Sequence, residues 1–378
     1  MSVVVCCGFG RLVIFIVATT AKIDIKSLLF EELQEMLRGL PEPSYRAGQI
    51  ADWLYEKRVE SFEDMTDLPH ALRARLARLF AFDRLEMVRV LGSRDTTQKF
   101  LFRLADRNLI ESVLIPASPA LYGEKSDRRT ICISTQVGCA YGCKFCASGL
   151  EGFSRNLRAN EIVDQIIAIE GASGETIDNI VFMGMGEPLA NFSNVTRAIR
   201  IINAQWGLGI GARRITVSTS GLAPQIRKLT DEPVQIRLAV SLHGATDEVR
   251  DQIMPINRRY NIETLLSACD YYVTHKKQRL TFEYILIAGV NDADDQAYLL
   301  ARHAKKLSAK VNLIPYNTVE GLPWLRPSRN RQEKFLSILR AHKIAATLRQ
   351  EKGHDIDAAC GQLRLQTRRD ERQRLITA

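Results

Sequence analysis

Several features that would place the chain in a specialised class of protein are missing from its sequence. It has no internal repeat and no low-complexity tract, which argues against a solenoid and against a disordered protein. The apolar stretch at residues 3–21 is interrupted by Arg11 and has no basic residue before it, so it suits neither a membrane span nor a secretory signal. We therefore expect residues 1–23 to be an extra N-terminal segment outside the fold. We expect the protein to be cytoplasmic, with no membrane partner.

A disulfide framework is also missing, although the sequence contains eight cysteines. Disulfide-rich domains are small, whereas this chain has 378 residues, of which 46% are hydrophobic and 25% are charged. That composition is typical of a globular protein with one large domain and a smaller one. In such a chain, a tight group of cysteines favours metal or redox chemistry in a reducing compartment.

The charge of the chain is basic but not extreme. Its formal net charge is +9 at pH 7. A modest basic excess is compatible with a polyanionic partner such as a nucleic acid, but it does not require one. Charge alone leaves the class of partner open.

The spacing of apolar residues changes twice along the chain. Residues 24–85 have apolar positions at helical spacing and predict a small helical domain, while residues 86–124 alternate with a period of two and predict a short β region. From 125 to 350, apolar β-branched runs alternate with helical stretches, which predicts a parallel sheet with helices outside it. Six such runs predict an α/β fold with an incomplete (β/α)6 barrel, and residues 351–378 form a C-terminal segment beyond it.

Three cysteines follow the first predicted barrel strand. Cys139, Cys143 and Cys146 have the spacing C-x3-C-x2-C, with an aromatic residue, Phe145, before the last of them. Three thiolates are one short of a closed zinc site and one short of filling a cubane iron–sulfur cluster. Either a fourth ligand comes from elsewhere, as in a zinc-stabilised RNA-binding module, or one metal corner is left open.

Polar residues follow the other predicted barrel strands, where ligand sites of such barrels lie. Each of them could be an ordinary strand-end cap, but together at one rim they predict a ring of residues that binds a ligand. Gly186 permits a close backbone approach. The members of this ring are Gly186, Glu187, Ser218, Ser241, Leu242, His243 and Asn317.

The cysteine spacing resembles that of the radical S-adenosylmethionine (SAM) superfamily. Longer stretches resemble one branch of it, the RlmN/Cfr adenine methyltransferases; they include "ICISTQVGCAYGCKFCASGLEGFSRNL", "FMGMGEPLANFSNV" and "DIDAACGQL". The resemblance implies one 4Fe–4S cluster on Cys139, Cys143 and Cys146, with SAM on its fourth iron and its amino group against Glu187. It also implies methylation of adenine C2 in 23S rRNA and in tRNA anticodon loops. Methylation at C8, as in the Cfr type, is the alternative.

The same resemblance implies three catalytic residues. Cys360 matches the cysteine that accepts a methyl group from one SAM before the carbon is passed to adenine. Cys132 matches the cysteine that then attacks the sulfur, leaving a disulfide, and Glu111 matches the base that removes the C2 proton. Taken without the resemblance, Cys132 fits a buried core cysteine and Glu111 fits a surface charge. Cys360 has small neighbours that suit an accessible thiol.

The resemblance further implies RNA as the partner and an electron donor such as flavodoxin. Basic side chains in the helical region and in the tail are candidates for phosphate contacts, whose strength falls steeply with salt. These side chains are Arg38, Arg46, Lys57, Arg58, Arg73, Arg75 and Arg78, and then Arg364, Arg368, Arg369, Arg372 and Arg374.

Overall fold

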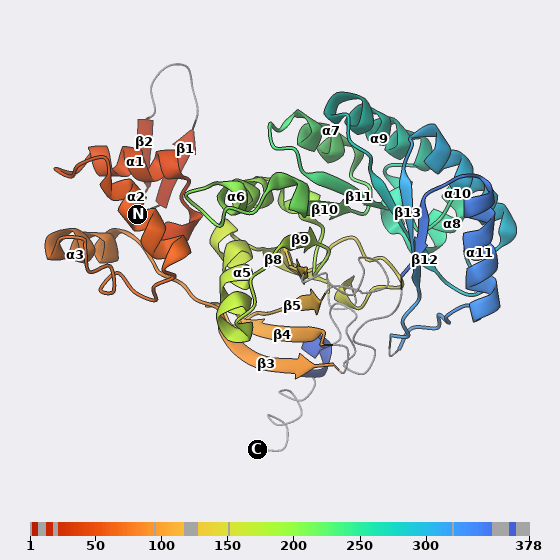
Figure 1. The fold of residues 1–378 in the computed structure, drawn as a ribbon, viewed down its shortest axis with the longest axis horizontal. Coiled ribbons are helices and arrows are strands. Elements are labelled where there is room, and N and C mark those ends of the chain that lie inside the picture. Colours follow the sequence, from red (N-terminus) through yellow and green to blue (C-terminus); the bar gives the residue numbers. More distant parts are fainter. Residues whose placement is uncertain are drawn as a thin grey trace.

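The fold was analysed in a computed structural model of the chain. The structure describes residues 22–93, 96–116, 128–149, 152–319, 321–349 and 363–367, and the backbone of residues 2–6 and 13–17. Figure 1 shows a small helical region at one end, in red and orange, beside a larger part in which helices surround a sheet.

The helical region contains short elements whose apolar sides face one another. Helix α1 begins after Leu29, whose N–H donates to the carboxylate of Glu32 at 2.8 Å, and it buries Leu33 and Leu37, which are four residues apart. The region includes η1 (Ile25–Ser27), α1 (Phe30–Arg38), α2 (Arg46–Ala51), the π-helix η2 (Asp52–Glu56) and α3 (His70–Leu79). The predicted helical character of this region agrees with these elements.

The helical region packs against the barrel through polar and aromatic contacts. Lys26 Nζ lies 2.8 Å from Asp164, and both side chains are buried. The ring of Phe30 stacks on Trp206 at a centroid distance of 5.6 Å. These contacts fix the small region against the outer face of the barrel helices.

Parallel strands and outer helices form the larger part, as predicted. The six predicted runs are β6 (Arg129–Cys132), β9 (Asn179–Phe182), β10 (Ile215–Thr219), β11 (Arg237–Ser241), β12 (Thr281–Leu286) and β13 (Lys310–Pro315). They pair in parallel in chain order, and β14 (Ala346–Leu348) adds a further parallel strand beside β13. Parallel strands between covered faces are rich in Val, Ile and Leu because both sides are buried.

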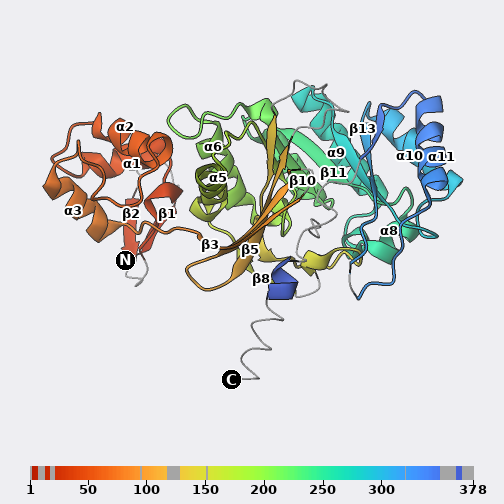
Figure 2. The ribbon, with the colours of Figure 1, turned by 60° about the horizontal axis from the view of Figure 1, so that its bottom comes forward.

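Helices cover the outside of these strands (Figures 1 and 2). They are α5 (Ala159–Ser173), α6 (Phe192–Asn203), α7 (Ala223–Asp231), α8 (Asp247–Ile253), α9 (Ile262–Lys276), α10 (Asp294–Lys306) and α11 (Arg329–Ala341). Short 3-10 turns occur at η3 (Ala147–Gly149), η4 (Pro188–Asn191), η5 (Ala212–Arg214) and η6 (Pro255–Arg258). In the part of the chain that is described, no helix is both long and apolar enough to cross a membrane.

The predicted β region is part of the same sheet. Its strands are β3 (Glu86–Gly92), β4 (Gln98–Arg103) and β5 (Leu109–Pro116). They are antiparallel and extend the barrel sheet beyond β6, giving the order β14-β13-β12-β11-β10-β9-β6-β5-β4-β3. Lys99, Val113 and Cys132 are therefore direct neighbours across three strands and share one face. The domain boundaries at 85, 124 and 350 stay predictions.

Three further segments complete the described fold. The N-terminal strands β1 (Ser2–Cys6) and β2 (Val13–Val17) pair with each other in an antiparallel sheet of their own. Strands β7 (Gln136–Gly138) and β8 (Phe153–Asn156) form a hairpin. The helix at 363–367, in blue beside the ends of β3 and β4 in Figure 1, buries Leu363 against Leu101 and Leu109.

Candidate active site

The cysteine motif lies on the loop that joins β7 to β8. The N–H of Cys139 donates to the carbonyl of Gly152 at 3.0 Å, which closes the base of the loop. Gly138 has a φ of +77°, and a Cβ there would lie 1.9 Å from the Gly152 carbonyl oxygen. A glycine is therefore required where the loop begins.

The three thiols of the motif line one cavity of about 250 Å³. Burial raises the pKa of Cys139 to about 12, and the negative charges of Cys146 and Glu187 raise it further. Burial and the two neighbouring thiolates likewise raise the pKa of Cys143. Three thiolates this close need a cation to be deprotonated together, and an iron–sulfur cluster supplies one. Among the described residues, no three His, Cys, Asp or Glu side chains are arranged to hold a single metal ion.

The turn after β9 places Glu187 in the same cavity. Gly186 has a φ of +94°, and a Cβ there would lie 2.4 Å from the side chain of Gln136. The Glu187 carboxylate is buried and accepts hydrogen bonds from the N–H groups of Leu189 at 3.0 Å and Ser220 at 2.6 Å. Burial raises the pKa of Glu187. A raised pKa means that the buried carboxylate is costly to ionise. A bound ammonium group would offset the cost of burying this negative charge, so the site suits an amino ligand.

His243 lines this cavity as a neutral ring. Its ring meets that of Phe145 edge-on at a centroid distance of 5.0 Å. Nδ1 of His243 lies 3.0 Å from the N–H of Ile285 and accepts its hydrogen, so the ring proton is on Nε2. Burial, and then the charge of Arg250, lower the pKa of His243 to about 3.

The other predicted ring residues divide between different places. Ser218 and Ser241 line the cavity of the three thiols. Leu242 is fully buried in the apolar core and does not line it. Asn317 lines a second cavity, where its side-chain oxygen accepts from Arg326 at 2.7 Å.

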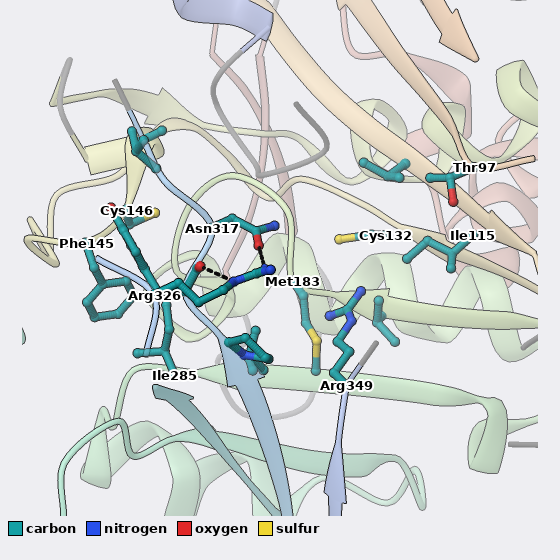
Figure 3. Close-up of a pocket in the computed structure, with 17 residues that line it drawn as sticks. Thr97, Ile115, Cys132, Phe145, Cys146, Met183, Ile285, Asn317, Arg326 and Arg349 are labelled. Carbon is teal, nitrogen blue, oxygen red and sulfur yellow. Dashed lines mark hydrogen bonds between the residues drawn. The ribbon is translucent and has the colours of Figure 1, made fainter. Parts of the chain in front are cut away.

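This second cavity adjoins the first and contains Cys132 (Figure 3). Its volume is also about 250 Å³. Its wall is mostly apolar, with Cys132 on one side and the hydrogen-bonded pair of Arg326 and Asn317 on another. Phe145, Cys146, Met183, Ile314 and Arg349 line both cavities. A molecule too large for one cavity can therefore extend into the other.

Glu111 is buried within the sheet and lines neither cavity. Its carboxylate lies 3.0 Å from Lys99 Nζ and accepts the N–H of Arg364 at 2.5 Å. Glu111 therefore lies beneath the helix at 363–367, on the face of the sheet that also carries Cys132. Arg364, expected to contact phosphate, is only 3% exposed, so that expectation is wrong for the conformation described here. Cys360 and the arginines at 368, 369, 372 and 374 are outside the described residues.

Sequence analysis missed Glu283, which lies on β12 and lines the thiol cavity. It accepts a hydrogen bond from Asn312 at 2.7 Å. Burial raises the pKa of Glu283 to about 7, and the positive charge of Arg349 opposes that shift. The sequence could have identified this residue, because Glu283 is the single acid in the apolar run "LTFEYILI".

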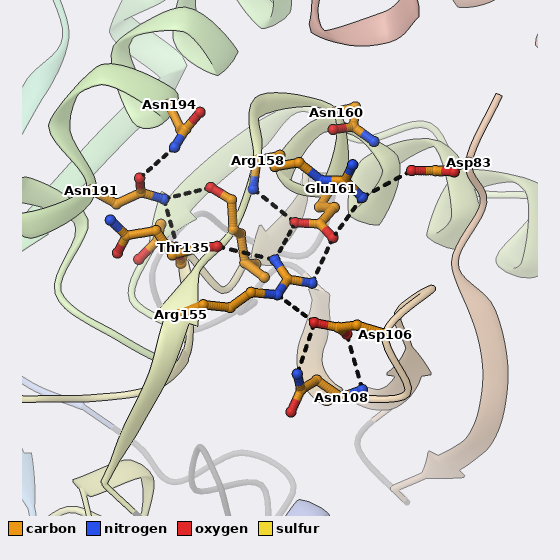
Figure 4. Close-up of polar contacts among 12 residues, drawn as sticks. Asp83, Asp106, Asn108, Thr135, Arg155, Arg158, Asn160, Glu161, Asn191 and Asn194 are labelled. Carbon is orange, nitrogen blue, oxygen red and sulfur yellow. Dashed lines mark hydrogen bonds and ion pairs between the residues drawn. The ribbon is translucent and has the colours of Figure 1, made fainter. Parts of the chain in front are cut away.

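A network of arginines and acids anchors the hairpin that carries the cysteine loop (Figure 4). Two guanidinium nitrogens of Arg155 on β8 donate to the Glu161 carboxylate, each at 2.8 Å, and its Nε lies 2.5 Å from Asp106. Arg158 lies 2.9 Å from Asp83, which precedes the β region. The network joins the hairpin, helix α5 and the β4–β5 turn.

Comparison with known proteins identifies the family. The family model "Radical SAM superfamily" matches residues 133–301, and "Ribosomal RNA large subunit methyltransferase N-terminal domain" matches residues 23–81. A curated relative from Akkermansia muciniphila, a probable dual-specificity RNA methyltransferase RlmN, is 53% identical over 90% of this chain and 95% of its own. The chain belongs to the RlmN family of the radical SAM superfamily.

Other RlmN relatives and one crystal structure agree with this assignment. A probable RlmN from Opitutus terrae is 52% identical over 95% of this chain and 99% of its own. The crystal structure of a radical SAM methyltransferase from Sphaerobacter thermophilus has a TM-score of 0.83 and 46% identity, covering 90% of this chain and 98% of that one. The predicted family, fold class and cofactors, a 4Fe–4S cluster and SAM, are therefore confirmed. Membership of the family excludes the zinc-module alternative.

Proposed function

We propose that this RlmN-family chain is a methyltransferase acting on C2 of adenine in 23S rRNA and in tRNA anticodon loops. The observation that carries the proposal is the pair of adjoining cavities, one lined by the three thiols and Glu187, the other by Cys132. The names of the relatives support the choice of substrate, since they describe probable dual-specificity RNA methyltransferases. Such substrates also fit a reaction in the cytoplasm.

The first cavity would hold the cofactors. Cys139, Cys143 and Cys146 would bind three irons of the cluster, and Glu187 would accept hydrogen bonds from the amino group of SAM. A cluster held by these thiols would supply the one-electron cleavage of SAM that allows attack on an unactivated C–H bond. Ser218 and Ser241 present hydroxyl groups to the rest of the ligand.

The second cavity and the tail would carry the transfer to RNA. The thiolate of Cys360 would attack the methyl carbon of one SAM, and S-adenosylhomocysteine would leave. The carbon radical obtained from a second SAM would take a hydrogen atom from that S-methyl group, and the resulting methylene radical would add to adenine C2, the adduct then returning one electron to the oxidised cluster. Glu111 would take the C2 proton, and the thiolate of Cys132 would then attack the Cys360 sulfur, releasing methylated RNA and leaving a disulfide. Cys132 lines this cavity, which supports its assigned role.

The helix at 363–367 supports a role for Cys360 near this face of the sheet. Leu363 is buried against Leu101 and Leu109, and the N–H of Arg364 is hydrogen-bonded to Glu111. Cys360 precedes Leu363 by three residues, which an extended chain spans in at most about 11 Å. The same hydrogen bond occupies the predicted base, so the helix has to shift before Glu111 meets a substrate.

The target adenine has to leave its stack, because C2 is otherwise inaccessible. Flipping a base from a duplex costs a few kcal/mol, so a loop adenine is favoured. Several predicted RNA contacts in the helical region are used within the fold: Arg58 lies 2.6 Å from Glu170, and Arg73 donates to the carbonyl of Glu63. Arg75 and Arg78 are exposed on α3 and are the better candidates for phosphate contacts.

Product analysis tests the proposed function. Anaerobically reconstituted protein is incubated with SAM, dithionite and either 23S rRNA fragments or tRNA, and digested nucleosides are separated by mass spectrometry against authentic standards. We expect 2-methyladenosine with both RNAs. A product of 8-methyladenosine would reassign the chain to C8 chemistry, and no methylated adenine from iron-loaded protein would refute the proposal.

A further inference from the structure

The fold buries one arginine that the proposed reaction does not use. Arg250 lies on α8, and its side chain is fully buried. Its guanidinium donates hydrogen bonds to uncharged oxygens, namely the side-chain oxygen of Asn257 and the carbonyl oxygens of Ser220, Ser241 and Leu242. Among the described residues, no carboxylate lies within ion-pair distance of Arg250. A buried cation without a charged partner is costly, so we looked for an anion that this cation could serve.

Helix α8 brings Arg250 close to the cysteine loop. The N–H of Lys144 donates at 2.9 Å to the carbonyl of Ile253, the last residue of α8. Met254 lines the thiol cavity, and its N–H donates to the carbonyl of Arg250 at 2.6 Å. Arg250 itself lines neither cavity. Its charge therefore lies behind the wall of the cavity in which the cluster would be held.

An asparagine separates Arg250 from the two nearest acids of its own helix. The amide nitrogen of Asn257 donates to Asp247 and Asp251, each at 2.9 Å, while the amide oxygen accepts from Arg250 Nε at 2.9 Å. Both acids are partly exposed, so water and salt screen their charges. Burial lowers the pKa of Arg250 to about 10, and the negative charge of Cys143 opposes this shift more than either acid does. The principal negative neighbour of Arg250 is thus on the cysteine loop.

Two glycines make room for the Arg250 side chain. A Cβ on Gly221 would lie 3.3 Å from a terminal guanidinium nitrogen, and a Cβ on Gly244 would lie 3.1 Å from Cγ of Arg250. Gly221 follows β10 and Gly244 follows β11, which are two of the strands whose ends line the thiol cavity. The strand ends therefore close around the guanidinium, and any side chain at either glycine would crowd it.

We propose that Arg250 is the buried counter-charge of the cluster and stabilises its reduced state more than its oxidised state. This inference rests on the proposed function, because it assumes a 4Fe–4S cluster on the three thiols. A cluster bound by three thiolates is negatively charged, and reduction adds one electron from a reductant such as dithionite without forming or breaking a bond. A fixed cation in a poorly solvated site favours the more negative state, which raises the reduction potential. Arg250 acts through its charge and does not touch the substrate.

An anaerobic redox titration of the cluster-loaded protein tests this inference. Arg250→Gln removes the charge, Arg250→Lys keeps the charge but loses most of the hydrogen bonds, and Arg227→Gln removes an exposed cation from α7 as a control. The cluster is followed by its absorbance and its electron paramagnetic resonance signal while dithionite and mediator dyes set the potential. For Arg250→Gln, we expect the ratio of reduced to oxidised cluster at a fixed potential to fall at least about tenfold, which corresponds to about 59 mV for one electron. Arg250→Lys and Arg227→Gln should titrate close to wild type.

A purely structural role would give a different pattern. If Arg250 only held the strand ends, Arg250→Lys would shift the potential as much as Arg250→Gln does. That result, or a wild-type potential in Arg250→Gln, would overturn the inference.

A second variant covers the case in which Arg250→Gln retains no iron. Asn257→Asp leaves Arg250 in place and puts a negative charge beside its Nε, so the reduction potential should again fall. An unchanged potential in Asn257→Asp would also overturn the inference. Wild-type protein that binds no iron would refute the proposed function itself, a result distinct from these.

Discussion

Lys99 and Glu111 form an ion pair inside the sheet, with Lys99 Nζ 3.0 Å from the carboxylate and neither side chain more than 1% exposed. Strand pairing brings them together, because Lys99 lies opposite Val113 and Glu111 is the previous residue on that face of β5. Burying two charges is costly, and apolar residues of similar volume are often as stable. The pair is therefore weak evidence for stability, and Lys99 would hold the proposed base Glu111 in place.

Replacing one partner of this pair should lower the stability of the protein, whereas replacing both partners should not. Lys99→Met removes the cation that compensates the buried Glu111 charge, so we expect a loss of about 3–5 kcal/mol in the free energy of unfolding. The double variant Lys99→Met and Glu111→Leu should recover most of that loss while remaining inactive. Urea denaturation and product analysis measure the two effects. A free energy of unfolding of Lys99→Met within about 1 kcal/mol of wild type would contradict the expected cost of the uncompensated charge.

The Glu283 carboxyl should make stability depend on pH. Its pKa rises from 4.5 in the unfolded chain to about 7 in the fold, so the folded state binds the proton more tightly. The stabilisation by the protonated form is complete below pH 4.5 and is lost as the pH rises through 7. The free energy of unfolding of Glu283→Gln, measured relative to wild type, should therefore increase by about 3 kcal/mol when the pH is raised from 5 to 8. Denaturation at both pH values, without cofactors, measures the difference, and a pH-independent difference would exclude the shift.

The Arg155 network should be needed to hold the cysteine loop. Burial opposes ionisation of Glu161, but hydrogen bonds from Arg155 hold its pKa below the usual value. Arg155→Ala should lower the free energy of unfolding by about 2 kcal/mol. It should also lower the amount of iron that the protein retains after gel filtration. The matched control is Arg214→Ala, which removes an exposed pair with Asp178 and should retain iron normally. Equal iron content in the two variants would show that the network does not support the loop.

Glu187 should set the affinity for SAM. Glu187→Gln removes the charge, and its amide nitrogen would face the N–H of Leu189 or Ser220, which both donate to the carboxylate. We expect the Kd of the cluster-loaded protein for SAM to rise at least about tenfold, as measured by calorimetry. The exposed change Glu263→Gln on α9 is the control. Unchanged affinity would place the amino group of SAM elsewhere.

Local pattern was enough to predict the elements and the metal-binding loop. Apolar runs such as "NIVF" and "RLAVS" became barrel strands because parallel strands are buried on both faces. The cysteine spacing was informative because one loop after a strand carries all three thiols.

Long-range packing explains what the sequence did not reveal. Leu242 follows Ser241 directly, and alternation along the strand turns one side chain to the cavity and the other to the core. Strand β5 joins β6, so the β region is part of the barrel sheet and brings Glu111 to the same face as Cys132. The burial of Arg364 depends on a helix that returns to the sheet from far along the chain. Local spacing contains no information about such contacts.

The central claim is that a methylated tail thiol transfers its carbon to adenine and a second thiol releases the product. The most direct test is a denaturing gel and intact-mass measurement of Cys132→Ala after reaction with SAM, reductant and RNA, beside Cys360→Ala. The account predicts that Cys132→Ala stays covalently attached to RNA, while Cys360→Ala forms neither an adduct nor a product. Normal turnover by both variants would contradict it.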